Sequence, residues 1–518
     1  MNALLVCALT PVSPVSFARV PKLPISPSLV MDESRFMVGQ AVCVCQPRTV
    51  EEIAAVLHEA NKTEQAVRIA GARTGLTGGS VPENELVLDM GAMKSIGPIL
   101  MNEKTGERTV RAEAGVSLAQ IQNYVTDQTN GAYFYPPDPT ETTASIGGTI
   151  ATDASGARTY RYGPTRSWIS GIDIMLPNGY LLSVKRGQYL VSPSIQQIQL
   201  TSPDEIATIT VPAPRYPWPA VKHAGGFYSS PDVFDVIDLF IGSEGLLGIV
   251  TAAELRLLPT IPSFSVVQFA PSEKSAFEFV RLLDQDDIIF PEWIEFYDRR
   301  SLQFLQTYAQ TLPIAIPPNA HSAVFYNIPL ADNTDILEET KLLRVFELAQ
   351  TAGLSEARSM VATDKKQKKE LDDLRHLLPE TVNRMIAERK KTVPDLHKIS
   401  TDFSVPADQS ISFWQVCSAA LTKSKLEWVA FGHIGNAHLH INILPNTEKE
   451  LRTAQKIYRT LAEKAVLAGG SISAEHGIGR LKRHLFSLQF SPQAITAMQK
   501  IKFAIDPTHV LNPNTLWE

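Results

Sequence analysis

The feature that most constrains this chain is glycine used repeatedly beside short runs typical of buried strands. One such run, residues 66–70, leads directly into the segment Gly71-Ala-Arg-Thr-Gly-Leu-Thr-Gly-Gly-Ser80. A second small-residue segment covers residues 144–156, and a third reads Gly242-Ser-Glu-Gly245. Glycine inside an element costs about 1 kcal/mol relative to alanine, so this repetition indicates steric need. The first segment alone fits a tight turn and a ligand-binding loop equally well, and the other two favour the ligand.

The spacing of these glycines excludes two common nucleotide-binding motifs. It does not fit Gly-x-Gly-x-x-Gly, and no Gly-Lys-Ser/Thr follows the first segment, so neither the Rossmann fingerprint nor the P-loop is supported. Small side chains and hydroxyls in residues 144–156 would instead let a flat, phosphate-bearing cofactor lie against the backbone.

Composition sets the broad class of the protein. The chain has 518 residues, of which 44% are hydrophobic and 20% charged, which is typical of a globular protein with two to four domains. A net charge of −6 gives no indication of nucleic-acid binding. Four cysteines are too few for a disulfide framework and indicate a reducing compartment. We therefore expect a cytoplasmic protein without a transmembrane segment, leaving peripheral attachment to a membrane open.

Changes in pattern along the chain predict its organisation. Prolines at 11, 14, 21, 24 and 27 follow a short apolar stretch, so we expect residues 1–30 to be a disordered tail. Strand and helix patterns then alternate over residues 31–260, and Pro259 and Pro262 mark a boundary. Longer helices between short strands follow over residues 261–470, and residues 471–518 form a C-terminal segment. The fold class expected from this order is α+β.

Histidines gather in the segment Gly432-His433-Ile-Gly-Asn-Ala-His438-Leu-His440-Ile-Asn442. On a strand, His438, His440 and Asn442 share one side, and the turn at Gly435 could bring His433 to the same place. A Glu475-His476 pair follows later. Two imidazoles and a carboxylate make an open site suited to Zn²⁺. Hydrogen-bonded structural histidines remain an alternative, because neither HExxH nor CxxC occurs.

Several motifs together resemble the FAD-binding domain of the vanillyl-alcohol oxidase/p-cresol methylhydroxylase superfamily. They are residues 70–80, Pro137-Asp138-Pro139, Ser145-Ile-Gly-Gly-Thr149, Arg161-Tyr-Gly163 and Gly242-Ser-Glu-Gly-Leu-Leu-Gly-Ile249. From about residue 40 onward, the chain is similar to the FAD-linked 2-hydroxy acid dehydrogenases. The resemblance implies a two-subdomain FAD-binding domain, an α+β substrate (cap) domain, and a C-terminal segment that packs back at the flavin site.

The same resemblance implies the cofactor and the residues around it. FAD would be held without a covalent bond, because residues 71–80 contain no histidine. The residues expected around FAD are Gly71, Arg73, Thr74, Gly75, Leu76, Thr77, Gly78, Gly79, Ser80, Pro137, Asp138, Ser145, Gly147, Gly148, Thr149, Asp153, Gly156, Glu244, Gly248, Ile249 and Asn512. Two positions depart from the family pattern: Asp153 replaces an asparagine, and Asn512-Pro-Asn-Thr515 replaces Asn-Pro-Gly-Lys.

The resemblance also implies roles at the reacting centre. His433, His440 and Glu475 match the family's metal ligands, for zinc or manganese, and His476 matches its catalytic base. The residues that resemble substrate contacts are Arg375, Lys398 and Asn442. His438 stands where the family commonly has asparagine. It could therefore compete as a metal ligand, or contact the metal ligands without binding the metal itself.

The activity implied is FAD-dependent oxidation of a small D-2-hydroxy acid, such as D-lactate, glycolate or D-2-hydroxyglutarate. Electrons would leave to a quinone, an electron-transfer flavoprotein or a cytochrome. Two alternatives are a flavin-bearing subunit of a glycolate oxidase-like complex with an Fe–S subunit, and a transferase similar to alkyldihydroxyacetonephosphate synthase. A homodimer is left open.

Overall fold

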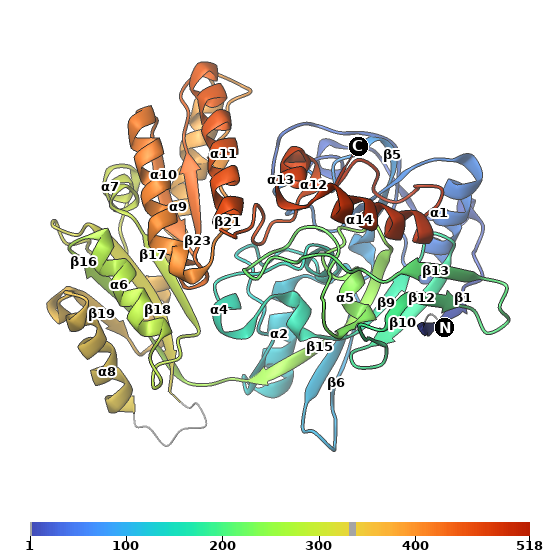
Figure 1. Ribbon diagram of the computed structural model, residues 1–518, viewed down its shortest axis with the longest axis horizontal. Coiled ribbons are helices and arrows are strands. Elements are labelled where there is room, and N and C mark those ends of the chain that lie inside the picture. The colour runs from blue at the N-terminus through green and yellow to red at the C-terminus, as the bar shows by residue number, and fades with distance from the viewer. Residues whose placement is uncertain (1–2, 331–337, 518) are drawn as a thin grey trace.

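The computed structural model describes residues 3–330 and 338–517. It has two lobes, the first built on a small and a large sheet and the second on one sheet. They are joined between β15 (Ile249–Pro259) and β16 (Ser263–Ala270), and the chain returns to the first lobe at its C-terminal end (Figure 1). No helix in the described ranges is both long enough and apolar enough to cross a membrane.

A small sheet and a large sheet form the first lobe. The small sheet has the order β2-β3-β5-β4, in which β3, β5 and β4 are parallel. Helix α1 buries one apolar face against it, and Thr49 caps the helix by accepting the N–H of Glu52 at 3.3 Å. The elements are β2 (Lys22–Leu23), β3 (Gln40–Cys45), α1 (Val50–Thr63), β4 (Val67–Ala70) and β5 (Glu83–Asp89).

The large sheet has the order β13-β12-β1-β10-β9-β15-β7-β6, with β8 paired to β15. Helices α2, α3 and α5 pack against it, whereas the short helix α4 contacts the second lobe, and β11 pairs with β14 beside the sheet. These elements are β1 (Ala3–Pro11), β6 (Ile96–Met101), β7 (Arg108–Glu113), α2 (Leu118–Thr129), β8 (Tyr133–Phe134), α3 (Ile146–Ala151), α4 (Thr159–Tyr162), β9 (Ile169–Met175), β10 (Tyr180–Lys185), β11 (Leu190–Val191), β12 (Ile195–Thr201), β13 (Thr208–Pro212), β14 (Phe234–Asp235), α5 (Val236–Phe240) and β15 (Ile249–Pro259).

The expectation of a disordered N-terminal tail is wrong for the described residues. Ala3–Pro11 forms β1, which lies inside the large sheet, parallel to β12 and antiparallel to β10. Cys7 and Leu9 are buried on one face of the strand, while Leu4 and Val6 face outward. The strand's partner β12 lies nearly 200 residues away in the sequence, so the local proline pattern could not indicate the pairing.

The second lobe is built on an antiparallel sheet covered by helices. Its sheet has the order β19-β16-β18-β17-β22-β23-β20, with β21 paired to β23, and helices cover it (Figure 1). The elements are β16 (Ser263–Ala270), α6 (Glu273–Asp284), β17 (Trp293–Tyr297), α7 (Arg299–Tyr308), β18 (Ser322–Pro329), α8 (Glu338–Thr351), β19 (Ser359–Ala362), α9 (Lys365–Lys390), β20 (Ile399–Ser400), β21 (Phe403–Ser404), α10 (Ser410–Ser424), β22 (Trp428–Gly432), β23 (His438–Ile443) and α11 (Glu448–Leu467).

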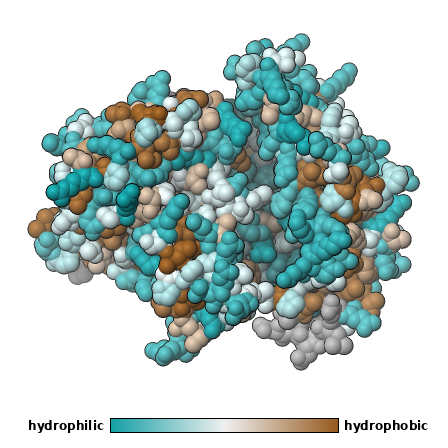
Figure 2. Space-filling view, turned by 180° about the vertical axis from the view of Figure 1, so that it is seen from behind, coloured by the Kyte–Doolittle hydropathy of each residue, from teal (hydrophilic) through white to brown (hydrophobic). Residues whose placement is uncertain are grey.

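The C-terminal segment crosses back and packs on the first lobe. It contains α12 (Gly479–Lys482), α13 (Phe486–Gln489) and α14 (Pro492–Ile505). Arg68 on β4 is fully buried and forms an ion pair with Glu85 on β5. It also donates to the Pro513 carbonyl at 2.6 Å and to the Thr515 hydroxyl at 2.9 Å, which holds the end of the C-terminal segment in place. Seen from behind, the surface of the molecule is hollowed near its middle (Figure 2).

Candidate active site

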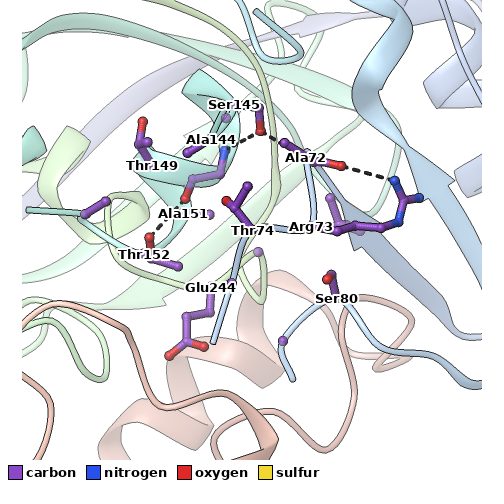
Figure 3. A pocket seen from close by; sticks show the side chains of 18 of the residues that line it. Ala72, Arg73, Thr74, Ser80, Ala144, Ser145, Thr149, Ala151, Thr152 and Glu244 are labelled. Atoms are coloured by element: carbon purple, nitrogen blue, oxygen red, sulfur yellow. Dashed lines mark hydrogen bonds between the residues drawn. The ribbon is translucent and has the colours of Figure 1, made fainter. Parts of the chain in front are cut away.

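A long cleft in the first lobe is lined by the glycine-rich segments. Its lining includes these of the residues expected around FAD: Gly71, Arg73, Thr74, Gly75, Leu76, Thr77, Gly79, Ser80, Ser145, Gly147, Gly148, Thr149, Glu244, Gly248, Ile249 and Asn512. Figure 3 shows several of them from close by. Sequence reasoning missed other lining residues, including Asp32, Ala114, Thr152 and Ser243. Thr152 and Ser243 lie inside two of the glycine-rich segments but were not assigned to the cofactor, whereas Asp32 and Ala114 belong to no motif.

Glycine is required in this cleft because the loop after β4 touches the start of α3. A Cβ at Gly71 would lie 2.3 Å from the Ser145 hydroxyl, which accepts hydrogen bonds from the N–H groups of Gly148 and Ala72 at 3.3 Å each (Figure 3). In the described part of the chain, the N–H groups of residues 74–77 meet no hydrogen-bond acceptor. Four such donors beside a cleft suit an anionic group such as a pyrophosphate.

Five of the residues expected around FAD do not line the cleft: Gly78, Pro137, Asp138, Asp153 and Gly156. Asp153 is buried and accepts from the Arg166 backbone N–H at 2.8 Å and from its guanidinium at 3.0 Å. Its carboxylate thus holds Arg166. A Cβ at Gly156 would lie 2.1 Å from the Asp138 carbonyl oxygen, so that glycine serves a close approach of two backbone segments.

The histidine segment and the Glu475-His476 pair come together at one point. His440 Nε2 lies 3.0 Å from Glu475 Oε1, and His433 Nε2 lies 3.4 Å from Glu475 Oε2. The rings of His440 and His476 stack with their centroids 5.5 Å apart. Glu475 and His476 also line the cleft described above, so the glycine loops and the histidines serve one site.

The two imidazoles that face Glu475 are oriented from behind by oxygen atoms. His433 Nδ1 lies 3.1 Å from Glu295 Oε1, and His440 Nδ1 lies 3.3 Å from the Thr401 carbonyl oxygen. In metal sites, a ligating imidazole characteristically turns its second nitrogen to such an acceptor. The Nε2 atoms of His433 and His440, together with Glu475, therefore form a donor set that fits a divalent metal ion.

Asp402 was not among the residues expected at the site. It is buried, and its carboxylate accepts the N–H of Glu475 at 3.2 Å and that of His476 at 3.1 Å. Ser473 donates to it at 3.0 Å, and Lys482 forms an ion pair with it. Asp402 also lies 3.5 Å from His476 Nδ1. Sequence reasoning assigned no role at the site to Asp402, which lies just before β21, and the fold brings it here.

Arg375 lies beside the histidine cluster rather than on the exposed face of its helix. It projects from α9, its side chain is 14% exposed, and its guanidinium donates to Glu295 at 3.1 and 3.3 Å. It also lies over the Trp293 ring, 4.1 Å from the centroid. Since Glu295 touches His433 as well, this carboxylate connects Arg375 to the histidine cluster.

Lys398 and Asn442 lie farther from Glu475 along the same lobe. Lys398 donates to Asn383 on α9 at 2.9 Å. Asn442 on β23 is buried, and its side-chain N–H donates to the His440 carbonyl oxygen at 3.3 Å. No described residue donates a hydrogen bond to its Oδ1 atom.

Burial and neighbouring charges shift the pKa values here. Burial lowers the pKa of His476 to about 4, which favours its neutral form. For His433, burial acts downward, but the carboxylates of Glu475 and Glu295 prevail and raise its pKa to about 9. Burial lowers the pKa of Lys398 to about 8.

Comparison with known proteins shows the family of the chain. The family model described as FAD linked oxidases, C-terminal domain, matches residues 263–516, and the FAD binding domain model matches residues 41–185. A D-2-hydroxyglutarate dehydrogenase of Xanthomonas citri pv. viticola is 29% identical over 94% of this chain and 91% of its own length. A D-lactate dehydrogenase of Archaeoglobus fulgidus is 26% identical over 91% of this chain and 90% of its own.

Two further similarities extend the comparison. The glycolate oxidase subunit GlcD of Bacillus subtilis is 26% identical over 92% of this chain and 88% of its own length. Among solved structures, an alkyldihydroxyacetonephosphate synthase matches with a TM-score of 0.61 and 14% identity, over 92% of this chain and 76% of the other. At that identity, the structural match shows the fold alone.

Proposed function

Since the chain belongs to the FAD-linked oxidases, we propose that it oxidises a small D-2-hydroxy acid to the corresponding 2-oxo acid. The observation that carries this proposal is the convergence of His433, His440, Glu475 and His476 at the cleft lined by the glycine-rich segments. The relatives' names support the substrate class, because they include dehydrogenases of D-2-hydroxyglutarate and D-lactate and a subunit of glycolate oxidase.

FAD would lie in the cleft along Gly71, Ser145 and Gly248, with its pyrophosphate at the free N–H groups of residues 74–77. When bound, FAD supplies the two-electron acceptor that the protein's own side chains lack. The chain's contribution is a groove in which glycines such as Gly71, Gly147 and Gly148 would let the backbone approach the cofactor closely.

A divalent ion, Zn²⁺ or Mn²⁺, would be held by His433, His440 and Glu475. Such an ion lowers the pKa of a hydroxyl group bound to it, which makes a 2-hydroxy acid easier to deprotonate. Glu295 and the Thr401 carbonyl orient the two imidazoles, so the donor set is prepared before any ligand arrives.

His476 would take the hydroxyl proton. Its Nδ1 faces Asp402, which favours a proton on that nitrogen and leaves Nε2 as the acceptor. Arg375 would bind the substrate carboxylate, since a guanidinium can hold two oxygens at once. Asn442, whose Oδ1 atom is unpaired, and Lys398 would complete the polar surroundings of the substrate.

Anaerobic reduction of the bound flavin tests the proposal. Purified protein should be yellow, and a panel of D-2-hydroxy acids should contain at least one member that bleaches its absorbance near 450 nm. The matching L-acids serve as controls, and added Zn²⁺ or Mn²⁺ tests the metal. Absence of bleaching by every hydroxy acid, with FAD and metal bound, would contradict the proposal. The electron acceptor, which we propose to be a quinone, a flavoprotein or a cytochrome, can be identified on the same preparation.

A further inference from the structure

A lysine that no sequence motif indicated lies in the middle of the site. Lys222 comes from the irregular stretch between β13 and β14, and its side chain is 5% exposed. Its backbone carbonyl accepts the Ser404 hydroxyl at 2.6 Å, and the next residues bond to Ser471 and Ser473. This stretch of the first lobe is therefore fastened to the C-terminal segment.

The Lys222 ammonium contacts two groups of the site. Nζ lies 2.6 Å from Glu475 Oε2 and 3.3 Å from His438 Nδ1. An ammonium can only donate hydrogen bonds, so Nδ1 of His438 must accept. The imidazole proton then resides on Nε2, which lies 3.1 Å from Asp402 Oδ1. In this fully buried ring, Nδ1 thus accepts from Lys222, while Nε2 lies within ion-pair distance of Asp402 without a hydrogen bond of regular geometry.

His438 differs in this respect from its neighbours. His433 and His440 turn Nδ1 to an oxygen acceptor and leave Nε2 directed at Glu475. In His438, the nitrogen nearer Glu475 is Nδ1, at 3.8 Å from Oε2, and the Lys222 ammonium lies closer to both. A metal ion at Nδ1 would have to displace that ammonium.

We propose that Lys222 and His438 are positioning residues that form a bridge between Glu475 and Asp402, and that His438 is not a metal ligand. Lys222 orients the Glu475 carboxylate, and His438 ties Lys222 to the same Asp402 that holds the backbone of Glu475 and His476. The bridge thus fixes the metal ligand and the base relative to each other. This inference rests on the metal site of the proposed function.

Zn²⁺ affinity of the FAD-loaded protein, measured by competition with a chromophoric chelator, tests the bridge. Lys222→Met removes the ammonium at similar length, and Lys222→Arg keeps the charge. His438→Asn keeps an acceptor near the position of Nδ1, whereas His438→Leu removes it. His440→Asn is the matched control that deletes a proposed ligand. Retained absorbance near 450 nm shows that each variant still folds around FAD.

The expected pattern separates ligands from positioning residues. Lys222→Met and His438→Leu should weaken Zn²⁺ binding about 10- to 100-fold, and Lys222→Arg should recover part of the loss. His438→Asn keeps the acceptor for Lys222 but loses the contact with Asp402, so its affinity should lie between that of His438→Leu and that of the unmodified protein. With Co²⁺ bound, the visible absorption of His438→Asn should keep its shape, because the ligand set is unchanged.

Three results would overturn the proposal. His438→Asn losing Zn²⁺ as severely as His440→Asn, with an altered Co²⁺ spectrum, would make His438 a ligand. Unchanged affinity in Lys222→Met would remove its positioning role. An unmodified protein that binds no Zn²⁺ would refute the bridge together with the metal site. Flavin reduction by a hydroxy acid in that same preparation would still decide the oxidation separately.

Discussion

At the scale of single residues, His476 carries the proposed proton transfer. It stands at the edge of the cleft, 25% exposed, with Nδ1 facing Asp402. Replacing it with alanine should slow anaerobic flavin reduction by about two to four orders of magnitude, because the proposed proton acceptor is removed. FAD content should stay unchanged. His397, an exposed histidine near β20, is the control; rapid-mixing rates for His476→Ala within twofold of that control would refute the assignment.

Glu244 gives a second prediction at this scale, for stability. Burial raises the pKa of Glu244 from 4.5 to about 7, although the N–H groups of Ile478 and Gly479, each at 2.8 Å, oppose the shift. A folded-state pKa above the unfolded one means that the folded protein binds the proton more tightly. The resulting stabilisation is complete below about pH 4.5 and is lost as the pH rises through 7.

The loss can be measured against Glu244→Gln, which has no such titration. Between pH 5 and pH 8, at constant excess FAD, the unmodified protein should lose up to about 3 kcal/mol of unfolding free energy relative to the variant. Parallel pH profiles of the two proteins would show that Glu244 does not titrate in this range.

At the scale of elements, helix α9 carries two arginines in different surroundings, one beside the histidine cluster and one exposed. Arg375 reaches Glu295 and the ring of Trp293, whereas Arg384, nine residues later, is exposed and donates to the Tyr308 carbonyl. Arg375→Lys should raise KM for the hydroxy acid about tenfold or more, because lysine cannot form the two-pronged contact. Arg384→Lys should leave KM unchanged. Equal KM values for both variants would exclude Arg375 from substrate binding.

The elements also show what the sequence could and could not predict. The alternation of side chains on β23 placed His438 and His440 on one side correctly, and the resemblance pointed to Arg375, which lies at the site. Lys222 and Asp402 could not be predicted, since they lie in irregular or very short segments and meet only through contacts between the lobes. A sequence motif reflects what the local backbone needs, such as glycine in a tight loop. The buried charges around Glu475 come together only through tertiary packing, which no local motif indicates.

At the scale of the whole molecule, the N-terminal strand β1 is the feature that local pattern misjudged, and it gives the last prediction. Cys7 is fully buried in the large sheet and Val6 is 49% exposed on the opposite face. Cys7→Asp should lower the unfolding free energy by about 3 kcal/mol or more, because it places a carboxylate without a partner in the core. Val6→Asp should change it by about 0.5 kcal/mol or less. If residues 3–11 were a disordered tail, both substitutions would leave the denaturant midpoint unchanged, so the difference between two adjacent residues decides whether β1 belongs to the sheet.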